Sequence, residues 1–163
     1  MVTTERRITA VRHIGIVVRD LERSLRFYRD ALGLRVVRAI EESGAYLDSL
    51  LALRNAQVKT VKLAAPDGPA VIELLQFDSH PDTTTAQRPI YAVGPSHVAF
   101  SVEDLDAVYH RLAQAGVSFN APPQRSPDSS AKVCCCQDPD GMTIELVEAV
   151  QSSPHPASRR AEC

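Results

Sequence analysis

One pattern of residues occurs twice along the chain, so a fold that suits the first copy must also suit the second. The segment 13–21, HIGIVVRDL, corresponds to the segment 97–105, HVAFSVEDL. Further along each copy, a Pro-Asp-Gly turn is followed by a short apolar run with one glutamate, VIEL at 71–74 and TIEL at 143–146. Such internal similarity indicates one supersecondary unit that is built twice. Each copy opens on a histidine and closes on a glutamate.

Each copy is predicted to fold as a strand, a helix and three further strands. Residues 11–18 are mostly β-branched and apolar, which favours the first strand. Asp20 suits the N-cap of the helix that follows, and Gly33 suits the position just beyond its end. Asp104 and Gly116 have the same places in the second copy. The other expected elements are strands at 34–40, 58–64, 70–77, 117–120, 131–137 and 142–147, with a short helical insert at 45–53.

These elements predict an α+β protein with two βαβββ modules, at 11–77 and 95–148. The polar segment 78–94 carries two prolines and is expected to link the modules, and residues 1–10 form an N-terminal arm. The C-terminal segment 149–163 contains Pro, Ser and Arg without hydrophobic periodicity, so it is predicted to be disordered.

The composition is that of an ordinary soluble protein, with 44% hydrophobic and 23% charged residues. The formal net charge is −2 and no long basic run occurs, so neither a nucleic acid nor a membrane is expected as a partner. No apolar run approaches the roughly 20 residues of a membrane span, and the N-terminus lacks a signal-peptide core. The cytoplasm is therefore the expected location, where the four cysteines would be reduced.

Three of the cysteines are consecutive, at 134–136. Neighbours on a strand point to opposite faces, so the three thiols cannot converge on one metal ion. Their spacing also matches no zinc motif. We interpret them as small, buried, apolar side chains, although one thiol could face a ligand.

Glu73 stands inside the apolar run AVIELLQF at 70–77, where an unpaired carboxylate would cost several kcal/mol. Strand alternation gives a candidate partner, because the aliphatic residues of four predicted strands share one face and a single His or Glu points the other way. These four polar residues are His13, Glu73, His97 and Glu145. The repeat allows them to meet on one concave surface. Two imidazoles and two carboxylates suit one divalent transition metal ion such as Zn, Ni, Co, Mn or Fe. The alternative is that duplication copied a His and a Glu used only for structural hydrogen bonds.

The motifs HIGIVVRDLERSLRFYRDALGL, SHVAFSVEDLDAVYHRLAQAGV and DPDGMTIELVE together resemble the vicinal-oxygen-chelate (VOC) superfamily. This superfamily includes glyoxalase I, methylmalonyl-CoA epimerase, extradiol dioxygenases, and bleomycin- and fosfomycin-resistance proteins. The resemblance implies that the eight strands curl around a metal-bearing cleft and that the family's metal positions fall on His13, Glu73, His97 and Glu145. It also implies a homodimer, because many members dimerise and some build sites across subunits.

A four-ligand set of this kind resembles the glyoxalase and epimerase branches, which implies a lyase or isomerase reaction. A small substrate would be chelated through neighbouring oxygens, and the ion would stabilise the negative oxygen formed when the carbon next to a carbonyl loses its proton. By similarity to glyoxalase I, Glu145 is expected to move this proton as general base and then general acid, while Glu73 remains a ligand.

Three alternatives stay open at the level of sequence. An extradiol-type Fe(II) dioxygenase would use two histidines and one carboxylate, although that branch does not generally use the position of Glu73 as a ligand. A fosfomycin-type protein would chelate a small anionic drug with three ligands. A protein of the bleomycin-resistance type would sequester a ligand without catalysis. The substrate-binding residues beyond the metal set are not predicted.

Overall fold

The computed structural model describes residues 8–66, 68, 71–84 and 89–150, and the chain divides into two compact units. Unit 1 is residues 1–86 and unit 2 is residues 87–163. The outer part of the expected N-terminal arm, the middle of the expected linker and the predicted disorder of 151–163 lie outside the described residues. Each unit contains one four-stranded mixed sheet with few helices, which confirms the predicted α+β class.

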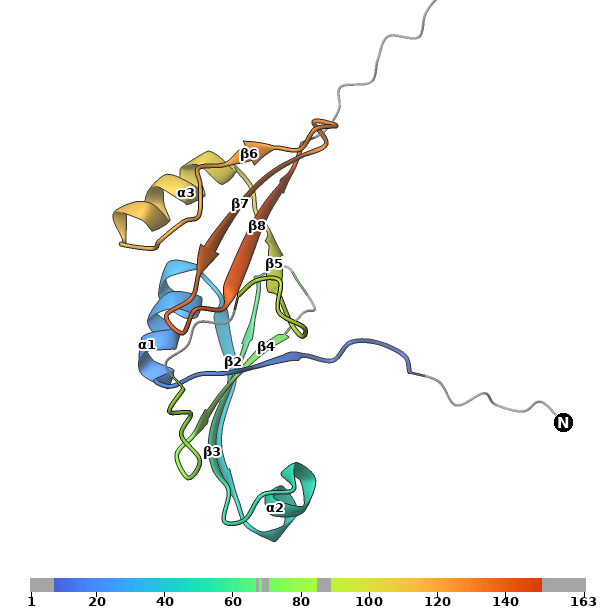
Figure 1. Ribbon diagram of the computed structural model, residues 1–163, viewed down its shortest axis with the longest axis vertical. Coiled ribbons are helices and arrows are strands. Elements are labelled where there is room, and N and C mark those ends of the chain that lie inside the picture. Colours follow the sequence, from blue (N-terminus) through green and yellow to red (C-terminus); the bar gives the residue numbers. More distant parts are fainter. Residues whose placement is uncertain (1–7, 67, 69–70, 85–88, 151–163) are drawn as a thin grey trace, which may run out of the picture. The chain divides into compact units, whose positions relative to one another are not determined.

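Unit 1 follows the predicted order of strand, helix and three strands, with one helical insert. Its elements are β1 (Ile14–Val17), α1 (Leu21–Leu25), η1 (Arg26–Ala31), β2 (Arg35–Ser43), α2 (Ala45–Leu51), β3 (Gln57–Ala64) and β4 (Val71–Phe77). The sheet order is β1-β4-β3-β2, with β1 parallel to β4 and the other pairs antiparallel. The insert α2 lies at the tip of the long β2–β3 hairpin (Figure 1).

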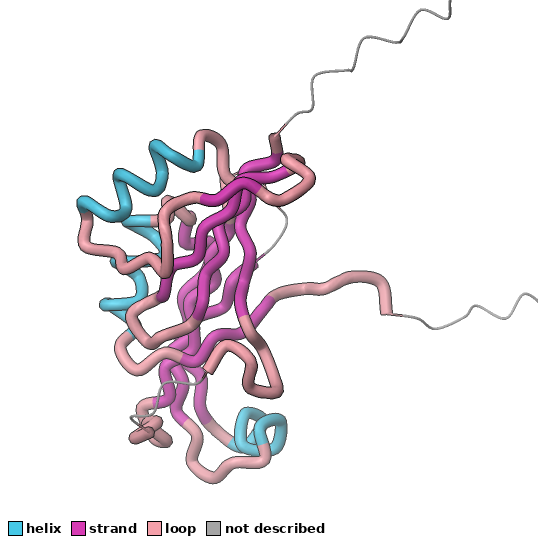
Figure 2. The backbone as a smooth tube through the Cα atoms, turned by 45° about the horizontal axis from the view of Figure 1, so that its top comes forward, coloured by secondary structure: helices cyan, strands magenta, loops and turns pink. Residues whose placement is uncertain are grey.

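Unit 2 repeats the arrangement without the insert. Its elements are β5 (His97–Ser101), α3 (Leu105–Gln114), β6 (Gln124–Arg125), β7 (Ala131–Gln137) and β8 (Thr143–Ala149). The sheet order β5-β8-β7-β6 matches that of unit 1, and β5 is again parallel to β8. The helix α3 runs along one side of this sheet (Figure 2).

The helices α1 and α3 begin where the sequence predicts, each directly after an aspartate N-cap. The Asp20 carboxylate accepts a hydrogen bond from the Arg23 N–H at 2.9 Å, and the Asp104 carboxylate accepts one from the Ala107 N–H at 3.1 Å. These bonds satisfy N–H groups that the first turn of a helix leaves without a partner. Beyond the helices, Gly33 has φ +81°, a left-handed conformation that glycine adopts without strain.

Gln76 and Glu148 are equivalent in the repeat, and each accepts a hydrogen bond from the first residue of the helix in its unit. In unit 1, the Leu21 N–H donates to Gln76 Oε1 at 2.7 Å. In unit 2, the Leu105 N–H donates to Glu148 Oε2 at 2.8 Å. The last strand of each unit therefore fixes the start of the helix that follows the first strand.

Aliphatic residues along the first and last strands of each unit form the core, as strand alternation predicts. The buried members are Ile16, Val18, Ile72 and Leu74 in unit 1 and Val98, Ile144 and Leu146 in unit 2. Tyr28 and Leu112, from the helices, are also buried. Glu73 and Glu145 occupy the alternate strand positions, so their side chains leave the opposite face of each sheet.

Two local expectations differ from the structure. The helix of unit 1 is α-helical only through Leu25 and continues as the π-helix η1, in which the Leu32 N–H bonds the Phe27 carbonyl at 2.9 Å. Phe27 and Tyr28, both in this segment, are buried.

The strand predicted at 117–120 is wrong. Phe119 forms an isolated bridge to Cys136, and the outer strand of the sheet is instead the short β6. Pro122 and Pro123 lie between the two segments, and a proline has no N–H to donate to a strand ladder. The pairing with β7 is therefore interrupted. Among the described residues, no helix has the length and apolar character that a membrane crossing requires.

Candidate metal centre

The first histidine and the first glutamate of the predicted set lie together in unit 1. His13 directly precedes β1, and Glu73 lies in the middle of β4. Because β1 pairs with β4 in parallel, with Gly15 opposite Glu73, the His13 side chain reaches the carboxylate. His13 Nε2 is 2.9 Å from Glu73 Oε2.

Gly15 keeps the strand next to Glu73 free of a side chain. A Cβ at this position would lie 3.2 Å from Leu75 Cδ1, tighter than an ordinary contact. In unit 2 the matching residue opposite Glu145 is Ala99. Both first strands therefore place a very small residue opposite the glutamate.

Unit 2 forms the equivalent pair. His97 is the first residue of β5 and Glu145 lies in β8, with His97 Nε2 3.4 Å from Glu145 Oε2. The other ring nitrogen, Nδ1, is 2.9 Å from Ser96 Oγ. A hydrogen bond at one imidazole nitrogen fixes the ring and leaves the second nitrogen available as a ligand.

In each pair, the distance between the imidazole nitrogen and the carboxylate oxygen is that of two neighbouring ligands on a metal ion. With bonds of about 2.1 Å, two neighbouring ligands are about 3.0 Å apart at an octahedral ion and about 3.4 Å apart at a tetrahedral one. The observed nitrogen–oxygen distances are 2.9 Å in unit 1 and 3.4 Å in unit 2. Neutral imidazole and carboxylate are also the donor types that such ions take. The residues present therefore suit a divalent transition metal.

The structure thus brings the four predicted residues together as two pairs, one in each unit. Within either unit, the described residues include no group of three or more His, Cys, Asp or Glu side chains at metal-ligand spacing. The four-ligand set therefore stays a prediction.

Lys62 is a charged neighbour of Glu73 that the sequence analysis missed. It lies opposite Glu73 in the β3–β4 ladder, and its Nζ is 3.1 Å from Glu73 Oε1. A bound metal ion is the partner of Glu73 expected from the sequence, and the structure adds a cation of the protein itself. The sequence did contain a sign of this contact. Lys62 and Glu73 are at roughly equal distances from the Pro-Asp-Gly turn, which predicts that they pair in a hairpin.

The corresponding position in unit 2 is Cys135, which lies opposite Glu145 in the β7–β8 ladder. Its neighbours Cys134 and Cys136 are buried on the other face of the strand, as alternation predicts. Burial raises the pKa of Cys134 to about 11 and that of Cys136 to about 12. The pKa of Cys135 is raised by burial and, second, by the Glu145 charge.

The three consecutive thiols should therefore react slowly with alkylating reagents in the folded protein, because the thiolate is the reactive form. We expect iodoacetamide at pH 7.5 to leave the tryptic peptide containing them almost unlabelled under native conditions. The same peptide should be labelled completely in 6 M guanidinium chloride, read by mass spectrometry. Rapid native labelling of Cys135 would contradict the raised pKa.

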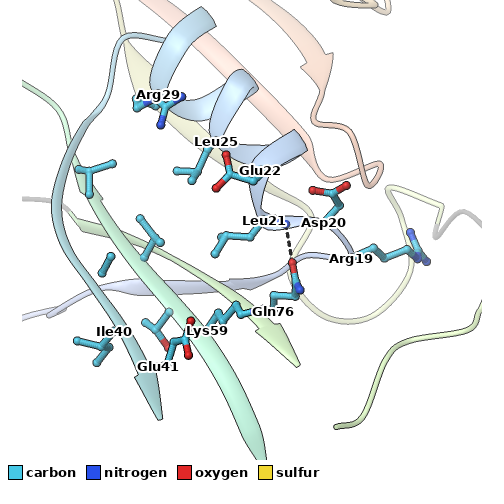
Figure 3. A pocket seen from close by; sticks show the side chains of 14 residues that line it. Arg19, Asp20, Leu21, Glu22, Leu25, Arg29, Ile40, Glu41, Lys59 and Gln76 are labelled. Carbon is cyan, nitrogen blue, oxygen red and sulfur yellow. Dashed lines mark hydrogen bonds between the residues drawn. The ribbon is translucent and has the colours of Figure 1, made fainter. Parts of the chain in front are cut away.

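A cavity of about 910 Å³ lies between α1 and the strands of unit 1 (Figure 3). Leu21 and Leu25 of α1 and Val61 of β3 supply apolar walls. Charged side chains of both signs surround them, including Arg29, Glu41 and Lys59. Lys59 and Val61 alternate with Thr60 and Lys62, so they belong to the sheet face away from Glu73. This cavity is separate from the His–Glu pair, and its mixed charge indicates no particular ligand.

Comparison with known proteins gives a consistent family. Residues 10–146 match the Glyoxalase/Bleomycin resistance protein/Dioxygenase superfamily. The chain is 32% identical over 144 residues to the uncharacterised protein YwkD of Bacillus subtilis, which covers 86% of this chain and 98% of YwkD. It is 30% identical over 154 residues to a lactoylglutathione lyase of Pseudomonas aeruginosa, which covers 84% of this chain and 81% of the lyase.

A solved structure gives the same picture of the fold. A glyoxalase family protein from Bacillus cereus matches with a TM-score of 0.82 at 24% identity, over 91% of this chain and 99% of that one.

Proposed function

The chain belongs to the Glyoxalase/Bleomycin resistance protein/Dioxygenase superfamily, the VOC superfamily, and on that premise we propose that it is a metal-dependent lyase or isomerase. The reaction is proton transfer next to the carbonyl of a small substrate that is chelated through neighbouring oxygens. The observation that carries this proposal is the His–Glu donor pair that recurs at ligand spacing in both units.

His13, Glu73, His97 and Glu145 are the residues that would hold the ion. Once bound, a divalent ion supplies Lewis acidity, which stabilises negative charge on a substrate oxygen. The two imidazoles would act as neutral nitrogen donors through Nε2. Glu73 already has both carboxylate oxygens engaged, Oε2 by His13 and Oε1 by Lys62, so it is suited to a fixed position.

Glu145 is suited to move the proton. Its side chain is 27% exposed, whereas that of Glu73 is 12% exposed. Its strand partner is a thiol rather than a cation. A carboxylate with fewer and longer contacts can turn toward a substrate carbon, accept its proton and return it to a neighbouring atom. The general base and general acid of the reaction is therefore Glu145.

The proposal is tested by metal content and by isotope exchange. Protein purified without chelator should contain about one equivalent of a divalent transition metal per chain. His13→Ala and His97→Ala should each weaken metal binding at least about 10-fold, measured by competition with a chromophoric chelator. In D₂O, the metal-loaded protein should exchange a carbon-bound proton of one member of a panel of α-hydroxy-carbonyl compounds and acyl thioesters.

The other outcomes separate the competing functions. Oxygen consumption with catechols would favour an extradiol-type dioxygenase. Tight ligand binding by a protein that holds no stoichiometric metal would favour a sequestering protein and would refute the enzyme. The homodimer stays a prediction of the family resemblance, and sedimentation velocity measures it directly.

A further inference from the structure

We propose that Lys62 gives the centre an excess positive charge and thereby selects substrates whose chelating oxygen pair includes a carboxylate. The chemical class is a 2-oxo or 2-hydroxy carboxylate rather than an uncharged hydroxy-ketone or thioester. This inference rests on the proposed metal centre, and it concerns the charge of the substrate at that centre.

The preference for a negatively charged substrate follows from the charge balance of the ligand set. Two ionised glutamates balance one divalent cation, and the two imidazoles are neutral, so the four ligands and their ion carry no net charge. Lys62, 3.1 Å from Glu73 Oε1, then adds one positive charge. Opposite charges attract most strongly where water is partly excluded. A chelating group with negative charge is therefore favoured over a neutral one of the same shape.

The geometry leaves the Lys62 ammonium able to reach a ligand. An ammonium group has three N–H donors, and among the described residues Glu73 accepts the one contact that Lys62 makes. The side chain is 25% exposed, so it is neither sealed in the core nor fully solvated. It lies on the same face of the sheet as Glu73, because the two residues are directly paired in the β3–β4 ladder.

The excess charge belongs to one copy of the repeat. At the position equivalent to Lys62, unit 2 carries the neutral thiol Cys135. Unit 2 shows that the repeat does not require a cation opposite its strand glutamate. A carboxylate oxygen of the substrate is therefore expected beside Glu73, and the carbon that loses its proton is expected beside Glu145. For a 2-oxo carboxylate this is the carbon on the far side of the keto group.

The test compares two probes of nearly the same shape, pyruvate and its uncharged methyl ester. Protein loaded with Co²⁺ is titrated with each probe, and binding is followed by the visible absorption of the ion. We expect wild type to bind pyruvate at least about 10-fold more tightly than the ester. Lys62→Met should reduce this preference about 10-fold, equivalent to about 1.4 kcal/mol. Lys62→Arg should retain most of it because the charge is conserved.

The matched control is Lys59→Met. Lys59 lies on the same strand but on the other face, where its Nζ is 2.8 Å from Asp78 Oδ2. The variant removes an equal charge from the same strand and should leave the preference for pyruvate unchanged. The Co²⁺ stoichiometry and the thermal unfolding of every variant show whether it is folded. If Lys62→Met does not fold, Lys62→Gln takes its place.

Each outcome has a distinct meaning. A fall in the preference with Lys62→Met but not with Lys59→Met supports the inference. Bound Co²⁺ with the same preference in wild type and Lys62→Met overturns the inference and leaves the metal centre intact. Wild-type protein that binds no Co²⁺ overturns the proposed centre, and with it the role of Lys62.

Discussion

Glu145→Gln should reduce the rate of substrate proton exchange by about 10²- to 10⁴-fold at saturating metal, the range typical for loss of a general base. Glutamine has nearly the same shape as glutamate but cannot take up the proton. The structure gives Glu145 a single imidazole contact, at 3.4 Å from His97, so the substitution removes no other ion pair within the described residues. The rate is measured by mass spectrometry of substrate incubated in D₂O.

Glu148→Gln is the matched control for this variant. Glu148 lies on the same strand three residues away and accepts the Leu105 N–H at 2.8 Å. The equivalent residue of unit 1 is already glutamine, because Gln76 accepts the Leu21 N–H at 2.7 Å. We therefore expect Glu148→Gln to keep both the fold and the exchange rate. An unchanged rate in Glu145→Gln would remove Glu145 from the proposed mechanism, whatever the metal content.

Leu74→Ala and Leu146→Ala should each lower the free energy of unfolding by about 2–5 kcal/mol, the cost of deleting a buried leucine side chain and leaving a cavity. The two residues are equivalent in the repeat, directly follow the strand glutamates, and are 0% and 1% exposed. Each packs against the helix-covered side of its sheet. Urea denaturation followed by circular dichroism measures the change.

An exposed leucine supplies the control for the same chemical change. Leu50, in α2, is 64% exposed, so Leu50→Ala should alter the free energy of unfolding by no more than about 0.5 kcal/mol. Equal losses for Leu50→Ala and Leu74→Ala would mean that the buried strand face does not stabilise unit 1 in the way the structure indicates.

The helix starts and the buried strand faces were predictable because they depend on residues close together in the chain. Asp20 and Asp104 are N-caps, and the alternating aliphatic residues from Ile72 to Leu74 and from Ile144 to Leu146 are buried. A capping bond spans three residues, and strand alternation spans two, so both can be inferred from spacing. The prediction of a strand at 117–120 was wrong. Two prolines follow this segment and interrupt its pairing with β7, which the apolar pattern alone does not reveal.

Residue order was also enough to place one His and one Glu in each copy and to predict that each pair lies on the sheet face away from the core. The charge around those pairs depended on strand register. Lys62 is opposite Glu73, whereas Cys135 is opposite Glu145. A register shifted by two residues would have kept the same hydrophobic faces and placed other side chains opposite the glutamates. Register sets which side chains are within a few ångströms across a ladder, because a shift of one residue moves every side chain to the other face. The two glutamates, alike in the repeat, acquire different neighbours only when the strands pair.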